Sequence, residues 1–184
     1  MTLTALCQVE NQMQRVMIVG GPGSGKSTLA RLLGEKTGLP VFHMDHLHWK
    51  PGWEPRDDEE KRLMALEIIA KDRWVFEGGM SSTYAERLAR SDTMIWLDLP
   101  FALRFWRVIK RTVRDHGKHR PDIADGCYEG FHKETLPFWW FILRTRKKNR
   151  AVLEKMAIDA GAAKLVLLQT RKDVDEYLTK LDAA

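Results

Sequence analysis

The nine residues from Gly20 to Thr28 constrain this chain more than any other segment. They read Gly-Gly-Pro-Gly-Ser-Gly-Lys-Ser-Thr, follow an apolar run at 16–19 and precede a helical pattern. Glycines let consecutive backbone N–H groups face inward around an anion, and the helix that follows adds the positive end of its dipole. A strand, a G-x-x-x-x-G-K-S loop and a helix in this order predict a binding site for the phosphates of ATP or GTP.

The residues of this loop have separable expected roles. Lys26 is expected to bridge the β- and γ-phosphates as a catalytic residue, and the Ser27 hydroxyl is expected to bind Mg²⁺. The loop residues that we expect to bind the nucleotide are Gly21, Gly23, Ser24, Gly25, Lys26, Ser27 and Thr28.

Apolar runs alternate with helical patterns along the rest of the chain. The runs expected to form strands are 15–20, 40–44, 73–77, 93–99 and 164–169. Helices are expected at 25–36, 56–71, 83–89, 101–115, 136–160 and 173–181. Continuous apolar strands are typical of sheets that are covered on both faces, and alternation of strand and helix is typical of parallel sheets. We therefore predict an α/β chain with the three-layer P-loop NTPase fold, a parallel sheet between helices.

Size and composition fit a single domain. At 184 residues, we expect a flexible N-terminal extension at 1–14 and one domain at 15–184, with a lid region at about 111–146. The two cysteines are widely separated, no leader pattern stands at the start, and no apolar run approaches the ~20 residues of a membrane span. These features favour a cytoplasmic protein without a membrane partner.

Polar residues follow the predicted strands, where ligands collect in parallel sheets. Asp45 is expected to orient an acceptor hydroxyl or a magnesium-bound water, with a turn cap as the alternative. Glu77, Gly78 and Gly79 are expected to bind the acceptor, with a place for Glu77 in the magnesium shell or a plain turn as the alternatives. Asp98 resembles a Walker B metal ligand, but the adjacent glutamate of a motor ATPase is missing.

Other candidate acceptor contacts come from loops and helices. Trp49 and Trp53 could enclose a planar acceptor or form a small satellite core. Arg87 could clamp an acidic acceptor or lie on the solvated surface.

Basic residues concentrate between 104 and 150, which carry 13 Lys and Arg against 5 Asp and Glu, a net charge of +8. A basic helix, an irregular stretch at 116–126 and a second basic group favour a lid that closes arginines onto a transferring phosphoryl group. We expect Arg107, Arg111 and Arg146 to be the catalytic arginines. A solvated helical face and a nucleic-acid-binding patch are the alternatives.

Taken together, these residues resemble the adenylate-kinase-like P-loop kinases, most of all the DNA-topology-modulation (FlaR-type) proteins. The resemblance rests on 20–28, 45–49 with Trp53, 77–79, 97–100 with Arg104, and the basic lid helix. It implies a five-stranded sheet in the order 2-3-1-4-5, bound Mg-ATP, and a purine near Arg171. The Pro-Arg that follows the third strand of adenylate kinases is absent after Gly79, which argues against AMP as the acceptor.

The sequence therefore predicts an ATP-dependent phosphotransferase that uses Mg²⁺ and acts on a small acceptor such as a nucleoside, nucleotide or similar metabolite. We expect a monomer or a homodimer. The alternative is a nucleic-acid-linked nucleotide-binding protein or ATPase with a role in DNA topology, although the sequence contains no recognised DNA-reading module.

Overall fold

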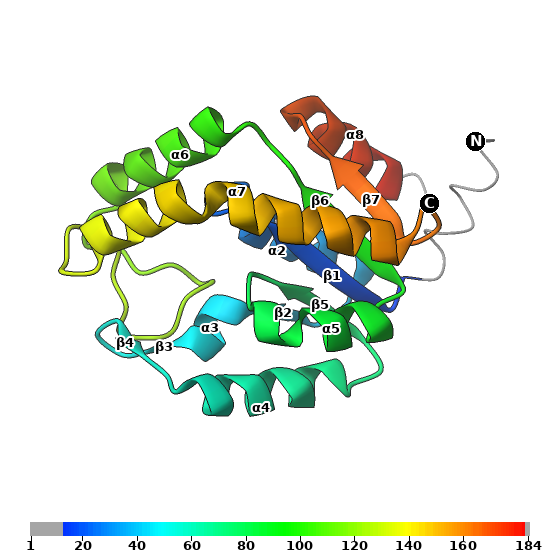
Figure 1. Ribbon diagram of the computed structural model, residues 1–184, viewed down its shortest axis with the longest axis horizontal. Coiled ribbons are helices and arrows are strands. Elements are labelled where there is room, and N and C mark those ends of the chain that lie inside the picture. Colours follow the sequence, from blue (N-terminus) through cyan, green and yellow to red (C-terminus); the bar gives the residue numbers. More distant parts are fainter. Residues whose placement is uncertain (1–12, 183–184) are drawn as a thin grey trace.

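A five-stranded parallel sheet lies at the centre of the computed structural model, which describes residues 13–182 (Figure 1). Its strand order is β2-β5-β1-β6-β7, and each neighbouring pair is parallel. The strands are β1 (Arg15–Gly20), β2 (Val41–His43), β5 (Trp74–Glu77), β6 (Thr93–Leu97) and β7 (Leu165–Leu168). In chain order these are the five predicted strands, so the expected order 2-3-1-4-5 is confirmed.

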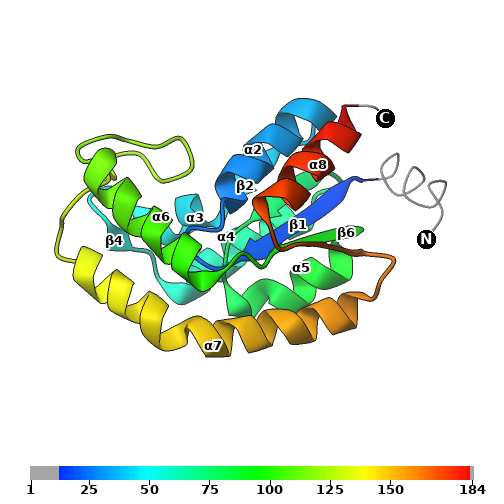
Figure 2. The ribbon, with the colours of Figure 1, turned by 90° about the horizontal axis from the view of Figure 1, so that it is seen from above.

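Helices cover both faces of this sheet, as the three layers of Figure 2 show. One face packs against α2 (Lys26–Thr37) and α8 (Arg171–Leu181) through a core that includes Ile18 and Leu33. The other face packs against α4 (Asp58–Ile69), α5 (Tyr84–Arg90) and the long α7 (Thr135–Ala160), with Trp74 and Phe76 at its centre. Neighbouring residues of each strand point to opposite faces, which is why the strands read as unbroken apolar runs.

The segment after β2 differs from the prediction. The strand ends at His43, and a short helix, α3 (Met44–His48), follows it directly. A two-stranded hairpin then forms from β3 (Trp49–Lys50) and β4 (Glu54–Pro55). Its turn places Gly52 and Trp53 in the left-handed region, with φ of 78° and 64°. A 3-10 turn, η1 (Ser81–Thr83), likewise precedes α5.

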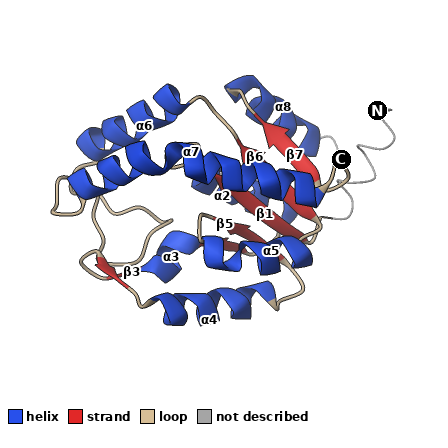
Figure 3. Cartoon of the chain, in the orientation of Figure 1, coloured by secondary structure: helices blue, strands red, loops and turns tan. Residues whose placement is uncertain are grey.

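The region predicted to be a lid, about 111–146, runs from the end of α6 (Phe101–Arg114) through an irregular stretch into the first turns of α7 (Figure 3). We call residues 115–134 the lid segment. It folds back onto the β3–β4 hairpin: Gly52 N donates to Gly126 O at 3.1 Å, and Cys127 Sγ donates to Lys50 O at 3.3 Å. Ile123 and Cys127 are buried as a result. The stretch at 116–126, which the sequence predicts to be irregular, is therefore part of a loop that packs against the β3–β4 hairpin.

The predictions of an N-terminal extension and of no membrane span can be compared with the described residues. Residues 1–12 of the predicted N-terminal extension lie outside the described residues. Its last two residues, Met13 and Gln14, belong to the fold, because Met13 is buried in the core and Gln14 N donates to Asp92 Oδ2 at 3.1 Å. Among residues 13–182, no helix has the length and apolar character that would let it cross a membrane.

Candidate active site

The loop between β1 and α2 is built to receive an anion. Gly23 has φ of 76°, and a Cβ there would overlap the backbone carbonyl of Arg104. α2 begins after Gly25, with no side-chain cap on its first turn and no acidic residue within it. The first-turn N–H groups and the positive end of the helix dipole are therefore left for a bound anion such as a phosphate group. Lys26 lies in the same turn, and its Nζ donates to Gly21 O at 3.4 Å.

Arg104 holds this loop in place from α6. Its Nε donates to Leu99 O at 2.9 Å, and its Nη1 donates to Pro22 O at 3.4 Å. The guanidinium passes so close to Gly21 that a side chain there would overlap it. Gly21 and Gly23 thus serve the close approach of Arg104 to the phosphate loop.

Glu77, at the end of β5, connects the phosphate loop to β2. Its buried carboxylate accepts from Ser27 Oγ at 3.0 Å and from His43 Nδ1 at 2.9 Å. Burial would raise the pKa of Glu77, but the hydrogen bonds from His43 and Ser27 and the charge of Lys26 bring it below its ordinary value. The ionised carboxylate beside the Ser27 hydroxyl is a donor set that suits a hard cation.

Asp45 lies on α3, one residue after Met44, rather than at the end of a strand as predicted. Its half-buried carboxyl interacts electrostatically with Lys26 and Glu77 and with Arg120 and Asp122 of the lid segment. Burial raises the pKa of Asp45, Glu77 raises it further, and Lys26 and Arg120 oppose the increase. A carboxyl with a raised pKa between a phosphate site and a lid can accept a proton from a ligand.

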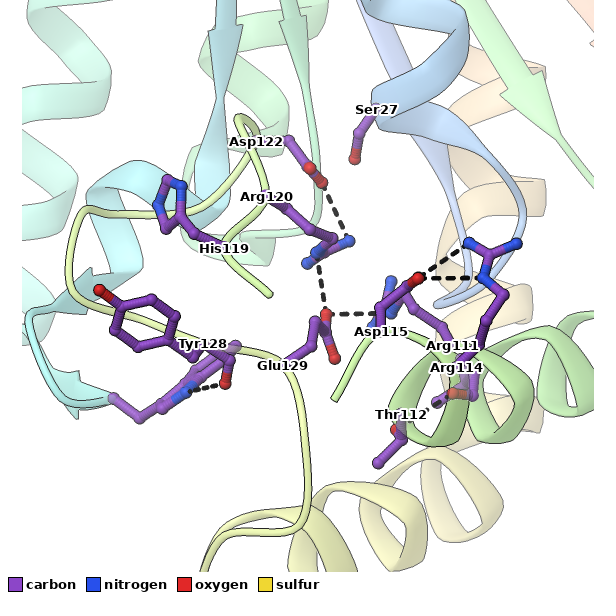
Figure 4. A network of polar contacts seen from close by, with 12 residues as sticks. Ser27, Arg111, Thr112, Arg114, Asp115, His119, Arg120, Asp122, Tyr128 and Glu129 are labelled. Atoms are coloured by element: carbon purple, nitrogen blue, oxygen red, sulfur yellow. Dashed lines mark hydrogen bonds and ion pairs between the residues drawn. The ribbon is translucent and has the colours of Figure 1, made fainter. Parts of the chain in front are cut away.

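Four charged side chains, three of them from the lid segment and one from α6, form a group of ion pairs (Figure 4). Glu129 Oε1 lies 3.1 Å from Arg111 Nε and 2.8 Å from Arg120 Nε, and Arg120 Nη1 lies 3.1 Å from Asp122 Oδ2. Burial and the adjacent Arg120 lower the pKa of Arg111, while Glu129 and Asp45 raise it. Sequence reasoning missed Arg120, Asp122 and Glu129. Their charge and their place between two basic helices were visible, but no periodicity indicated which way they point.

The three arginines predicted as catalytic have different surroundings. Arg111 belongs to this group of ion pairs, and Asp45 contributes to its electrostatic environment. The guanidinium of Arg146 instead lies over the ring of Phe101, 4.9 Å from its centroid. Arg107 is half-buried, and its side chain forms no hydrogen bond or ion pair with any residue of the described region.

The substrate-binding role predicted for Arg87 is wrong. The residue is fully buried, and its guanidinium donates to Gly78 O at 2.8 Å and to Phe76 O at 2.7 Å. It also lies over the Phe76 ring, 4.3 Å from the centroid, and burial lowers its pKa to about 10. Arg87 therefore fixes the backbone at the end of β5, and its charged group is not exposed to an acceptor.

The metal-binding role predicted for Asp98 also conflicts with its surroundings. Arg150 of α7 forms a two-pronged ion pair with it, Nε to Oδ1 at 3.2 Å and Nη2 to Oδ2 at 2.9 Å. Glu77 is the carboxylate that contacts Ser27 instead. The partner of Asp98 lies 52 residues away in sequence, so the strand-end argument could not foresee it.

The two predicted tryptophans form an edge-to-face pair with centroids 5.3 Å apart. Trp53 stacks on His132 at 4.7 Å, and its Nε1 donates to Tyr128 O at 2.9 Å. Trp53 thus joins the hairpin to the lid segment. Trp49 is half-buried and also meets His48 edge to face.

The remaining predicted residues lie at the margins of this arrangement. Gly78 is buried with φ of 112°, and Gly79 is exposed next to it. Ser24 is buried, and Thr28 is exposed on the first turn of α2. Arg171 is exposed at the start of α8, where it pairs with Asp175 at 3.8 Å.

Comparison with known proteins identifies the family of this chain. The model of an AAA domain family, AAA_18, matches residues 16–136. A probable gluconokinase from Schizosaccharomyces pombe is 28% identical over 164 residues, which are 89% of this chain and 78% of the relative. A shikimate kinase from Persephonella marina is 31% identical over 110 residues, 52% of this chain and 67% of the relative.

A solved structure agrees with the fold. The shikimate kinase from Bacteroides thetaiotaomicron superimposes with a TM-score of 0.55 at 18% identity, covering 93% of this chain and 97% of that one. These proteins are named for small-molecule phosphorylation, so the resemblance to DNA-topology-modulation proteins gains no support from them. The matched family model, the kinase relatives and the phosphate loop agree: the chain belongs to the AAA domain family AAA_18 and is a P-loop small-molecule kinase.

Proposed function

We propose that the chain transfers the γ-phosphoryl group of ATP, bound with Mg²⁺, to a hydroxyl group of a small polyhydroxylated carboxylic acid. The observation that carries this proposal is that the carboxyl of Asp45, on the short helix after β2, interacts electrostatically with both Lys26 of the phosphate loop and Arg120 of the lid segment. The names of the two relatives refer to gluconate and shikimate, which are both carboxylic acids with several hydroxyl groups.

The phosphate loop supports the assignment of the nucleotide. Its uncapped first-turn N–H groups and Lys26 suit the phosphates, and Ser27 with Glu77 suits the cation. When bound, Mg²⁺ supplies charge neutralisation on the phosphate oxygens. Arg171, exposed at the start of α8, remains our proposal for a contact with the purine.

Asp45 acts on the acceptor in this proposal. The acceptor oxygen forms a bond to the γ-phosphorus, the bond from that phosphorus to the β–γ bridging oxygen breaks, and the hydroxyl proton passes to Asp45. Arg111 and Arg120 stabilise the negative charge on the transferring group. Trp49 and Gly79 flank the acceptor.

The nucleic-acid-linked alternative has no specific observation in its favour. Such a role needs basic side chains that are free to contact phosphates along a strand. Arg111 and Arg150 are engaged in ion pairs within the chain, and Arg146 lies over an aromatic ring.

The test is ATP consumption with Mg²⁺ in the presence of gluconate, shikimate, other sugar acids, the corresponding neutral sugars, nucleosides and nucleoside monophosphates. We expect turnover that requires one hydroxylated carboxylic acid and little with its neutral counterpart. Turnover only with a nucleoside or nucleotide would contradict the proposed acceptor class.

Two variants then test the site. Asp45→Asn should lower kcat by about 10²- to 10⁴-fold, with KM for ATP within about threefold of wild type. Asp72→Asn is the matched control, because Asp72 is exposed in the turn after α4. An Asp45→Asn variant with the kcat of the control would exclude Asp45 as the proton acceptor.

A further inference from the structure

Glu129 is a buried acidic residue in the lid segment that the proposed reaction does not use directly. Its side chain is 6% exposed, and its carboxylate lies between two arginines from different parts of the lid (Figure 4). Arg111 comes from the last turns of α6, and Arg120 comes from the start of the returning loop. The burial of a carboxylate together with two guanidinium groups carries a desolvation penalty, so the role of Glu129 needs an explanation.

The backbone of Glu129 is fixed at both of its polar groups. Glu129 N donates to Lys118 O at 2.9 Å, and Gly117 N donates to Glu129 O at 2.8 Å. Cys127, two residues earlier, is buried against the hairpin. The lid segment therefore fixes the backbone of Glu129 independently of the two arginines.

Glu129 contacts both arginines through the same carboxylate oxygen. Its Oε1 meets the Nε of Arg111 and the Nε of Arg120, the atoms nearest the aliphatic stems. Arg120 Nη1, an outer nitrogen, pairs with Asp122 Oδ2 at 3.1 Å. Guanidinium groups bind phosphoryl oxygens through these outer nitrogens. One carboxylate oxygen thus brings two guanidinium groups together at their Nε atoms.

Charge explains why a carboxylate is needed at this position. Arg111 and Arg120 are both largely withdrawn from solvent and repel each other. Without a negative group between them, two neighbouring guanidinium groups would separate or turn toward solvent. Asp45 takes part in the electrostatics of both arginines, so any such movement changes the charge around the proposed proton acceptor.

We propose that Glu129 is a positioning residue that holds Arg111 and Arg120 side by side toward Asp45, so that both reach the phosphoryl group during transfer. The proposal rests on the proposed function, because Glu129 acts only through the two arginines. It predicts a defect in the transfer step that exceeds any defect in the binding of substrates.

The test compares Glu129→Gln with wild type in the ATP-dependent assay of the best acceptor. We expect kcat to fall about 10- to 100-fold, because misplaced transition-state donors cost rate, while both KM values stay within about threefold. Glu129→Asp, which keeps the charge on a shorter stem, should recover part of the loss. Asp115→Asn is the matched control: this lid carboxylate pairs with the exposed Arg114 and Lys118. It should leave kcat near wild type.

A double-mutant cycle keeps the proposal testable if Glu129→Gln also loosens the lid. In an Arg111→Ala background, Glu129→Gln should cost distinctly less in kcat than in wild type, because one of its two targets is gone. An equal fold-loss in both backgrounds, or a kcat of Glu129→Gln equal to that of Asp115→Asn, would overturn the proposal. Absence of phosphoryl transfer in the wild-type enzyme with every acceptor would instead contradict the proposed function.

Discussion

Replacement of Arg87 by methionine distinguishes a role of this residue in stability from a role in binding the substrate. Methionine preserves an unbranched apolar stem but leaves the carbonyl oxygens of Phe76 and Gly78 without their buried donors. A hydrogen bond from a charged donor contributes about 1.5–3 kcal/mol, and removal of a buried charge returns part of that sum. We therefore expect a loss of about 2–4 kcal/mol in the free energy of unfolding, which lowers Tm by about 5–15 °C.

The measurement is urea unfolding followed by circular dichroism, together with kinetics at a temperature where the variant is folded. Arg90→Met is the matched control on the same helix. Arg90 is exposed, and its hydrogen bonds to the carbonyls of Ile69, Ala70 and Lys71 are 3.3–3.5 Å long. It should lose less than about 1 kcal/mol. Wild-type stability of Arg87→Met together with a large rise in the acceptor KM would refute our reasoning and restore Arg87 as a substrate clamp.

Two further predictions concern Asp45 and its support. Because burial raises the pKa of Asp45 and the ionised form accepts the proton, kcat should rise with pH through a midpoint above the ordinary aspartate value of 3.8. A pH profile of kcat with no such acidic limb would contradict this role. Gly78→Ala should destabilise the fold by about 1–3 kcal/mol and lower kcat, because φ is 112° and the new Cβ would lie 2.5 Å from Met44 Cβ, next to Asp45. Gly79→Ala, with its nearest atom at 3.3 Å, should unfold like wild type in the same denaturation assay.

The sheet and the phosphate loop could be predicted because their signals are local. A strand buried on both faces needs a continuous apolar run, and each of the five runs became a strand in the central sheet. The loop motif carries its own geometry, since its glycines and the following helix are adjacent in sequence. Contacts between neighbours in sequence are the ones that a pattern of residues can specify.

The directions of the lid side chains could not be predicted from sequence, because they depend on contacts between residues that are far apart in the chain. Basic residues at three- and four-residue spacing define a helix face, but they do not say whether that face meets solvent or the site. Both Arg111 and Arg146 belong to basic clusters, but their side chains have different partners. Arg111 pairs with the buried Glu129, whereas the guanidinium of Arg146 lies over the ring of Phe101. Arg120 and Glu129 lie in a segment without periodicity, and its position is set by contacts with a hairpin about 75 residues earlier.

The attachment of the lid segment to the β3–β4 hairpin has a consequence for how this enzyme can change. Gly52 is hydrogen-bonded to Gly126, and Trp53 is hydrogen-bonded to Tyr128. Two stretches that are far apart in the chain therefore depend on each other for their conformation. A chimera that exchanges the hairpin alone between related chains would lose these contacts, and so would one that exchanges the lid segment alone. We therefore expect a substitution in one stretch to be accompanied by a compensating substitution in the other, so that their residues covary among related chains.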